Sequence, residues 1–100
     1  MKSSYLLTIL AASSLLFNQA YAGDASAGKA KAETCAGCHG ENGISLQDDW
    51  PNLAGQKAGY LKLSLQAYRD GTRKNALMPG MAAGLSDENI ANLAAYYSGL

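Results

Sequence analysis

The stretch Cys35-Ala-Gly-Cys38-His39 decides how this chain folds, because it places two thiols and an imidazole within five consecutive residues. Thiols at this spacing can add to the two vinyl groups on one edge of a porphyrin, and the residue that follows them then lies under the iron. We therefore predict that Cys35 and Cys38 attach one haem of the c type through thioether bonds. His39 is predicted to be the proximal iron ligand.

Three other uses of this motif have to be weighed against haem attachment. A structural zinc site needs four protein ligands, and a chain with two Cys and one His would need a carboxylate or a second chain to complete it. A thioredoxin-like redox pair expects a preceding strand and a βαβ setting, whereas residues 25–34 are rich in Ala and Lys and predict a helix. A plain disulfide leaves the adjacent His39 without a role. The motif therefore favours haem.

Residues 1–22 have the composition of a secretory signal peptide. They contain one positive charge at Lys2, an apolar stretch over residues 5–17, and the small-residue ending Ala20-Tyr21-Ala22. The apolar stretch is shorter than the roughly 18 residues that a membrane-spanning helix needs. The alternative is an uncleaved N-terminal anchor. We predict cleavage, a mature domain at residues 23–100 without stable membrane insertion, and a periplasmic location.

A mature domain of this size is only marginally stable on apolar packing alone. The 48% hydrophobic content of the whole chain includes the apolar signal segment, so the mature domain has less apolar material than that figure implies. A haem would supply a large apolar surface for helices to pack against. The composition therefore supports a core built around a cofactor.

The first predicted helix has Asp24 as its N-cap and ends at about Cys35. Its carboxylate can accept hydrogen bonds from free backbone N–H groups and lies at the positive end of the helix dipole. Gly28 lies inside this helix, where glycine is unfavourable. A close helix crossing would explain that glycine, and the alternative is a glycine that the helix merely tolerates.

Two further helices are predicted from the spacing of apolar residues. The second covers residues 58–69 and ends at Asp70-Gly71. The last begins after Ser86, which is its predicted N-cap. The residues expected on the buried faces of these two helices are Leu61, Leu65 and Tyr68, then Ile90, Leu93, Ala94 and Tyr97.

Long loops are predicted at residues 40–55 and 72–84, where glycine, proline and asparagine are frequent. No β pattern and no internal repeat appear. Two long loops in so small a chain would be unusual around an empty core. We therefore predict an all-α fold in which three main helices and long loops surround one covalent haem.

The second iron ligand cannot be a histidine of the same chain, because His39 is the only one. Met1 leaves with the signal peptide, so Met78 and Met81 are the thioether candidates. A residue that precedes proline is restricted to extended backbone, and this setting favours Met78, which is followed by Pro79. From the residues alone, both methionines remain open.

Taken in order along the chain, several segments resemble the class I cytochromes c. The similarity is greatest to the small bacterial group whose longer members, the cytochrome c4 proteins, join two such domains, and it covers essentially the whole mature sequence. The sequence contains no second attachment motif, so electron transfer between two haems of one chain is not expected. The segments are Cys35-Ala-Gly-Cys-His39-Gly, Pro51-Asn-Leu-Ala-Gly-Gln56, Tyr60-Leu61, Met78, Leu85-Ser-Asp-Glu-Asn-Ile90 and Leu93-Ala-Ala-Tyr-Tyr97.

This resemblance implies three features of the site. Met78 takes the position of the iron-ligating methionine. The carbonyl of Pro51 accepts a hydrogen bond from the free N–H of the haem histidine, His39, and tunes its basicity. The first and last helices cross near Gly28, with Tyr97 or Tyr96 against it.

An iron with one imidazole and one thioether ligand has no open position for a substrate, and this ligand pair raises the reduction potential. We therefore expect an electron-transfer protein rather than an enzyme. The predicted role is a periplasmic one-electron carrier between respiratory donors, such as a quinol-oxidising complex or a dehydrogenase, and a terminal oxidase or reductase. Two alternatives are a haem subunit held on a dehydrogenase, and an iron that loses Met78 and performs peroxidase or ligand-sensing chemistry.

The charged side chains indicate only in part which molecules the protein binds. The sequence offers no sign of nucleic-acid binding. A cluster of basic residues is either a solvated face or a docking surface for a redox partner. These residues are Lys57, Lys62, Arg69, Arg73 and Lys74.

Overall fold

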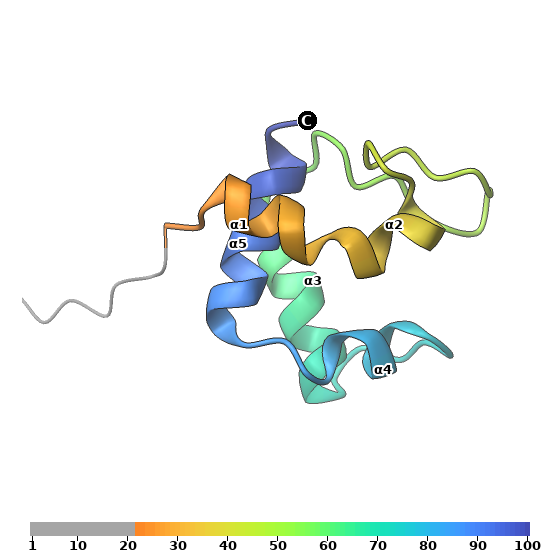
Figure 1. Cartoon of the computed structure of the whole chain (residues 1–100). Helices are drawn as coiled ribbons and strands as arrows, with labels where there is room; N and C mark the ends of the chain where they lie inside the picture. The colour runs from red at the N-terminus through yellow and green to blue at the C-terminus, as the bar shows by residue number, and fades with distance from the viewer. Residues whose placement is uncertain (1–21) are drawn as a thin grey trace, which may run out of the picture.

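The computed structural model describes residues 22–100, and its regular structure there is entirely helical, as Figure 1 shows. Residues 1–21, which hold nearly all of the predicted signal peptide, lie outside this part. Within residues 22–100 no helix has the length and apolar character needed to cross a membrane. The helices are α1 (Ala25–Lys31), α2 (Glu33–His39), α3 (Ala58–Asp70), α4 (Met78–Ala82) and α5 (Asp87–Ser98).

The first predicted helix is present but extends further than expected and is interrupted once. Asp24 caps α1 and accepts from the backbone N–H groups of Ser26 at 2.8 Å and Ala27 at 3.3 Å. At Ala32 the backbone tightens, because its carbonyl accepts from Cys35 N at 2.8 Å as well as from Ala36 N at 3.0 Å. Helix α2 then continues through the whole attachment motif rather than ending at Cys35.

Helices α1 and α5 cross at Gly28, and Figure 1 shows this crossing. A Cβ atom at Gly28 would lie 1.9 Å from the carbonyl oxygen of Asn92 and 2.8 Å from the Cβ of Tyr96. No side chain fits into that space, so the close crossing requires glycine. The predicted role of Gly28 is confirmed, and Tyr96 is the aromatic residue beside it.

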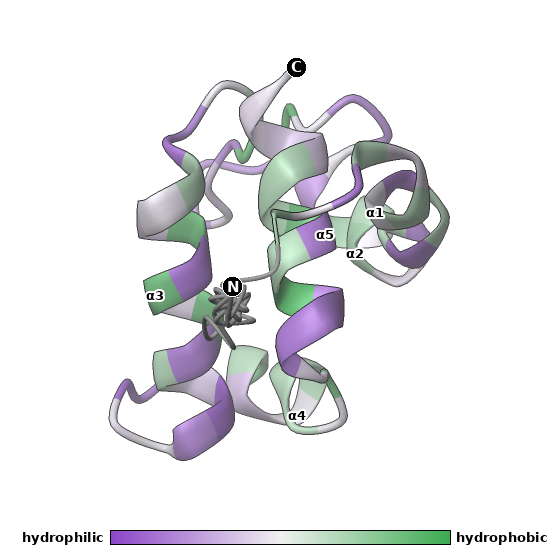
Figure 2. Ribbon diagram, turned by 90° about the vertical axis from the view of Figure 1, so that its left-hand side faces the viewer, coloured by the Kyte–Doolittle hydropathy of each residue, from purple (hydrophilic) through white to green (hydrophobic). Residues whose placement is uncertain are grey.

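The core lies where α3 and α5 meet the start of α2. The predicted buried face of the last helix is confirmed, since Ile90 and Leu93 are fully buried and Ala94 and Tyr97 nearly so. On α3 only Leu61 is buried, while Leu65 and Tyr68 of its predicted face are half-buried. Figure 2 shows the corresponding hydrophobic segments on α3 and α5, interrupted by hydrophilic ones. The buried apolar residues among those described are Ala32, Leu61, Ala82, Ile90, Ala91, Leu93, Ala94 and Tyr97, half of them alanines.

The segment after α3 differs from the sequence expectation. Gly71, with φ of 81°, ends α3 as predicted. However, the predicted loop over 72–84 contains the short helix α4, so Met78 begins a helix instead of lying in extended backbone. Asn75 explains this difference, because its side-chain oxygen accepts from the N–H groups of Leu77 at 2.9 Å and Met78 at 3.0 Å. Pro79 fits a first helical turn, where a backbone N–H is not needed.

The predicted loop at 40–55 is present and continues to residue 57. Figure 1 shows it as the yellow-to-green excursion between α2 and α3. Gly40, with φ of 85°, allows the chain to leave α2 and enter this loop. The loop thereby returns towards the end of α2, where His39 lies.

Candidate haem site

Helix α2 carries all three residues of the attachment motif within its last two turns. Cys35 and Cys38 are three residues apart, so they lie on the same face of the helix. Both are free thiols: Cys35 is half-buried against the core, and Cys38 is exposed. Burial raises the pKa of the Cys35 thiol. The pair is therefore available for bonds to a group that lies against the end of α2.

His39 ends α2 and is only 8% exposed. Its Nδ1 atom lies 2.8 Å from the carbonyl oxygen of Pro51. A carbonyl oxygen can only accept, so Nδ1 carries a proton, and in the neutral ring Nε2 is the nitrogen with the lone pair. A histidine that ligates a metal typically donates its other ring N–H in this way. The contact that the resemblance implied for Pro51 is thus present in the structure.

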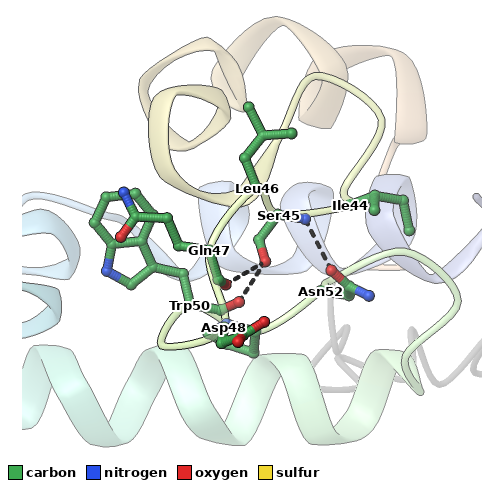
Figure 3. Close-up of a pocket in the computed structure, with 8 residues that line it drawn as sticks. Ile44, Ser45, Leu46, Gln47, Asp48, Trp50 and Asn52 are labelled. Carbon is green, nitrogen blue, oxygen red and sulfur yellow. Dashed lines mark hydrogen bonds between the residues drawn. The ribbon is translucent and has the colours of Figure 1, made fainter.

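The loop that presents Pro51 is held by further hydrogen bonds, which Figure 3 shows around a cavity of about 380 Å³. The Ser45 hydroxyl lies 2.5 Å from the carbonyl oxygen of Trp50, and the Ser45 N–H donates to the side-chain oxygen of Asn52 at 2.8 Å. Sequence reasoning missed Ser45 and Asn52. Loop composition was the only signal available, and it does not indicate which polar residues meet.

The two methionine candidates both lie on α4, on the same side of α3 as α2 in Figure 1. Met78 is the first residue of α4 and is half-buried. Met81 is 49% exposed. The structure therefore separates the two by burial, and Met78 is the more enclosed.

The residues present fit a covalently bound haem. The fit rests on two free thiols on one face of α2, a buried imidazole with Nε2 available, and large apolar side chains that the polypeptide leaves uncovered. Leu46 is 95% exposed and Leu77 is 58% exposed. Within residues 22–100 no group of three or more His, Cys, Asp or Glu side chains could hold a metal ion. The zinc alternative therefore lacks a ligand set in this part of the chain.

The thiol-redox and disulfide alternatives also find no support in the described residues. The motif lies on a helix preceded by another helix, and residues 22–100 contain no strand of the kind that a thioredoxin-like βαβ unit needs. The two cysteines are not bonded to each other. Haem attachment remains the chemistry that uses both thiols and the histidine.

Comparison with known proteins places this site in a family. The Cytochrome c family model matches residues 25–100. Cytochrome c-554(548) of Halomonas halodenitrificans is 59% identical over 80 residues, which cover 77% of this chain and 96% of that protein. The thiosulfate dehydrogenase electron acceptor of Stutzerimonas stutzeri is 42% identical over 67 residues, which cover 64% of this chain and 31% of that protein.

The fold is shared with solved structures. Reduced recombinant cytochrome c4 from Pseudomonas stutzeri superimposes with a TM-score of 0.73 at 41% identity, over 77% of this chain and 45% of that chain. The chain thus spans less than half of that structure, and the expected likeness to one part of a cytochrome c4 is confirmed. This chain belongs to the cytochrome c family and is an electron-transfer protein with one covalently attached haem c.

Proposed function

We propose that Cys35 and Cys38 form the two thioether bonds to the haem and that His39 and Met78 are the axial iron ligands. The observation that carries this assignment is the contact between His39 Nδ1 and the Pro51 carbonyl, which leaves Nε2 free on a buried ring. The support for Met78 over Met81 is its greater burial. Under this assignment the protein would supply both ligands that hold the iron.

When bound, the haem supplies a one-electron couple between Fe(III) and Fe(II). With His39 and Met78 holding the iron, the protein would leave no position at which a substrate or water could bind it. The thioether ligand favours Fe(II) and so raises the potential. One electron enters from a reduced donor protein and one leaves to an oxidised acceptor protein, and no bond in the chain is made or broken. This proposal describes a carrier rather than an enzyme.

We further propose that the protein works in the periplasm between a respiratory donor, such as a quinol-oxidising complex or a dehydrogenase, and a terminal oxidase or reductase. The composition of residues 1–22 supports export. The similarity to a thiosulfate dehydrogenase electron acceptor makes a dehydrogenase of that kind a candidate donor.

The basic residues noted in the sequence differ in their availability to a partner. Arg69 is engaged with Asp87 at 2.8 Å and with Asp70 at 3.2 Å. Arg73 lies over the Tyr68 ring at 4.6 Å and is exposed. We propose that an exposed surface, named here the α3 face, docks an acidic partner. It runs from the residue before α3 along this helix to the turn after it. The α3 face consists of Lys57, Tyr60, Leu63, Arg73 and Lys74, all exposed.

Docking at the α3 face has a direct test in electron-transfer rates. The second-order rate with an acidic redox partner should fall as ionic strength rises, because salt screens exposed charges. Charge reversal at Lys74 should lower the rate at low salt, whereas the same change at Lys29, an exposed residue of α1, should have a smaller effect. Equal effects of the two changes, or a rate that ignores salt, would remove the α3 face from the proposal.

The carrier function is tested by spectra and a redox titration of the purified protein. The titration should follow a single one-electron curve, and the reduced protein should not bind carbon monoxide, because Met78 occupies the sixth position. Rapid carbon monoxide binding at neutral pH would instead support ligand-sensing or peroxidase chemistry. A colourless protein from a host that attaches haem would contradict the whole assignment.

A further inference from the structure

Ser45 holds the chain on both sides of Pro51, the residue whose carbonyl accepts from His39. We propose that Ser45, together with Asn52, positions the Pro51 carbonyl and through it the His39 ring, and thereby sets part of the reduction potential. This inference rests on the proposed role of His39 as an axial ligand. Ser45 and Asn52 then influence the iron without contacting it.

The chemistry of proline explains why other residues must hold the Pro51 carbonyl in place. The two hydrogen bonds of Ser45 described next are named here the clamp. Proline has no backbone N–H, so it cannot anchor its own peptide group by donating a hydrogen bond. The peptide groups before and after it must be held instead. The Ser45 hydroxyl donates to the carbonyl of Trp50, which precedes Pro51, at 2.5 Å. The Ser45 N–H donates to the side chain of Asn52, which follows Pro51, at 2.8 Å.

The Ser45 hydroxyl has a second possible acceptor, but its bond to the Trp50 carbonyl remains the main one. Its oxygen also lies 3.0 Å from the carbonyl oxygen of Gln47, and Figure 3 shows both contacts. One hydroxyl has one proton, so the closer Trp50 oxygen is the principal acceptor. The Ser45 N–H contact with Asn52 is independent of the hydroxyl. Each half of the clamp can therefore be removed separately.

Three further hydrogen bonds hold the chain around Pro51. The carbonyl of Gly43 accepts from Leu53 N at 2.8 Å and Ala54 N at 3.0 Å. The Gln56 side-chain N–H donates to the backbone carbonyl of Asn52. Hydrogen bonds therefore hold the chain on both sides of Pro51 and fix its carbonyl where it accepts from the His39 ring.

The direction of the effect follows from the ring chemistry. A hydrogen bond from Nδ1–H to a well-placed carbonyl makes the imidazole a stronger electron donor at Nε2. A stronger donor stabilises Fe(III) and lowers the potential. Loosening the Pro51 carbonyl should therefore raise the potential. Loss of Met78 should lower it, so the sign of the shift distinguishes the two effects.

The experiment compares Ser45→Ala with Ser45→Thr in the haem-bearing protein. Ser45→Ala should raise the midpoint potential by about 30 mV, which corresponds to about a threefold change in a one-electron equilibrium constant. It should also shift the proton NMR signals of the His39 ring in the oxidised protein. Ser45→Thr keeps the hydroxyl and should retain the original potential. Ser98→Ala is the control, since it removes a hydroxyl that donates to Ala95 within α5.

The outcomes separate this inference from the ligand assignment. An unchanged potential and unchanged His39 signals in Ser45→Ala would overturn the inference while leaving the carrier function intact. If Ser45→Ala yields no haem protein, Asn52→Ala removes the other half of the clamp and should give the same upward shift. A wild-type protein without a His/Met spectrum would instead overturn the proposed function.

Discussion

The two segments proposed to supply the iron ligands are held in different ways. On the His39 side, the chain is tied by bonds that join distant residues, such as His39 to Pro51, 12 residues apart, and Ser45 to Asn52, 7 apart. On the Met78 side, Asn75 holds the start of α4 through residues only two and three positions away. The hydrogen bonds on the His39 side are thus tertiary, whereas those that hold the start of α4 are local. We expect the Met78 side to open first.

The largest expected effect separates the two ligands. His39→Ala should reduce the amount of haem-bearing protein about tenfold or more, because it removes both the ligand and the contact with Pro51. Met78→Ala should retain the normal amount of covalent haem. Absorbance of the haem at equal protein concentration measures both. Equal losses of haem in the two variants would contradict the proposed difference between the two sides.

A matched pair of glycines tests the comparison through stability. Gly43 has φ of 74°, and a Cβ there would lie 2.8 Å from the backbone nitrogen of Ala54. Gly43→Ala should therefore lower the free energy of unfolding by about 2 kcal/mol. Gly80 lies in α4, where a Cβ would meet nothing within 4 Å. Gly80→Ala should raise that free energy by up to about 1 kcal/mol.

Chemical denaturation followed by circular dichroism measures both glycine variants. The prediction is a difference in sign between them. Similar destabilisation by the two substitutions would show that α4 is packed as tightly as the loop beside His39.

The local turn on the Met78 side can be weakened by itself. Asn75→Ala removes the acceptor for the N–H groups of Leu77 and Met78 and should cost about 1 kcal/mol locally. The sulfur-to-iron absorption band of the oxidised protein should then disappear at a lower denaturant concentration than in wild type. Asn42→Ala changes an exposed asparagine of the other loop and is the control. A band as resistant as in wild type would indicate that Asn75 does not hold Met78.

The smallest effect concerns the core beneath both segments. Tyr97 is 3% exposed, its hydroxyl has no hydrogen-bond partner among the described residues, and burial raises its pKa. Its contribution to stability is fully present below the ordinary tyrosine pKa of about 10 and is lost as pH rises towards the folded-state pKa. The free energy of unfolding of Tyr97→Phe, taken relative to that of wild type, should therefore be higher near pH 11 than at pH 7 by on the order of 1 kcal/mol.

Unfolding free energies of the two proteins at both pH values measure this linkage. Neither ligand should change in Tyr97→Phe at neutral pH. A pH dependence identical to that of wild type would show that Tyr97 does not titrate differently in the folded state.

The parts of the structure that follow from local chemistry could be predicted. The cap at Asp24, the buried face of α5 and the end of α3 at Gly71 depend on neighbouring residues, and the sequence displays them directly. Gly28 was also informative, because a glycine inside a helix needs an explanation and a close crossing provides one.

The remaining features depend on which distant groups meet. The pairing of Ser45 with Asn52 joins two ordinary polar residues of a loop, and no local pattern distinguishes it from other combinations. Helix α4 was missed because the proline after Met78 suggested extended backbone, whereas the Asn75 side chain starts a helical turn there. The tightening of the chain at Ala32 also has no signal in an alanine- and lysine-rich segment.

The identity of the sixth ligand is the central claim, and one absorption measurement tests it most directly. The sulfur-to-iron charge-transfer band should be present in oxidised wild type and in Met81→Ala, and absent in Met78→Ala. The midpoint potential of Met78→Ala should also fall by more than about 60 mV, a tenfold change in the one-electron equilibrium. A band that is retained in Met78→Ala and lost in Met81→Ala would contradict the account.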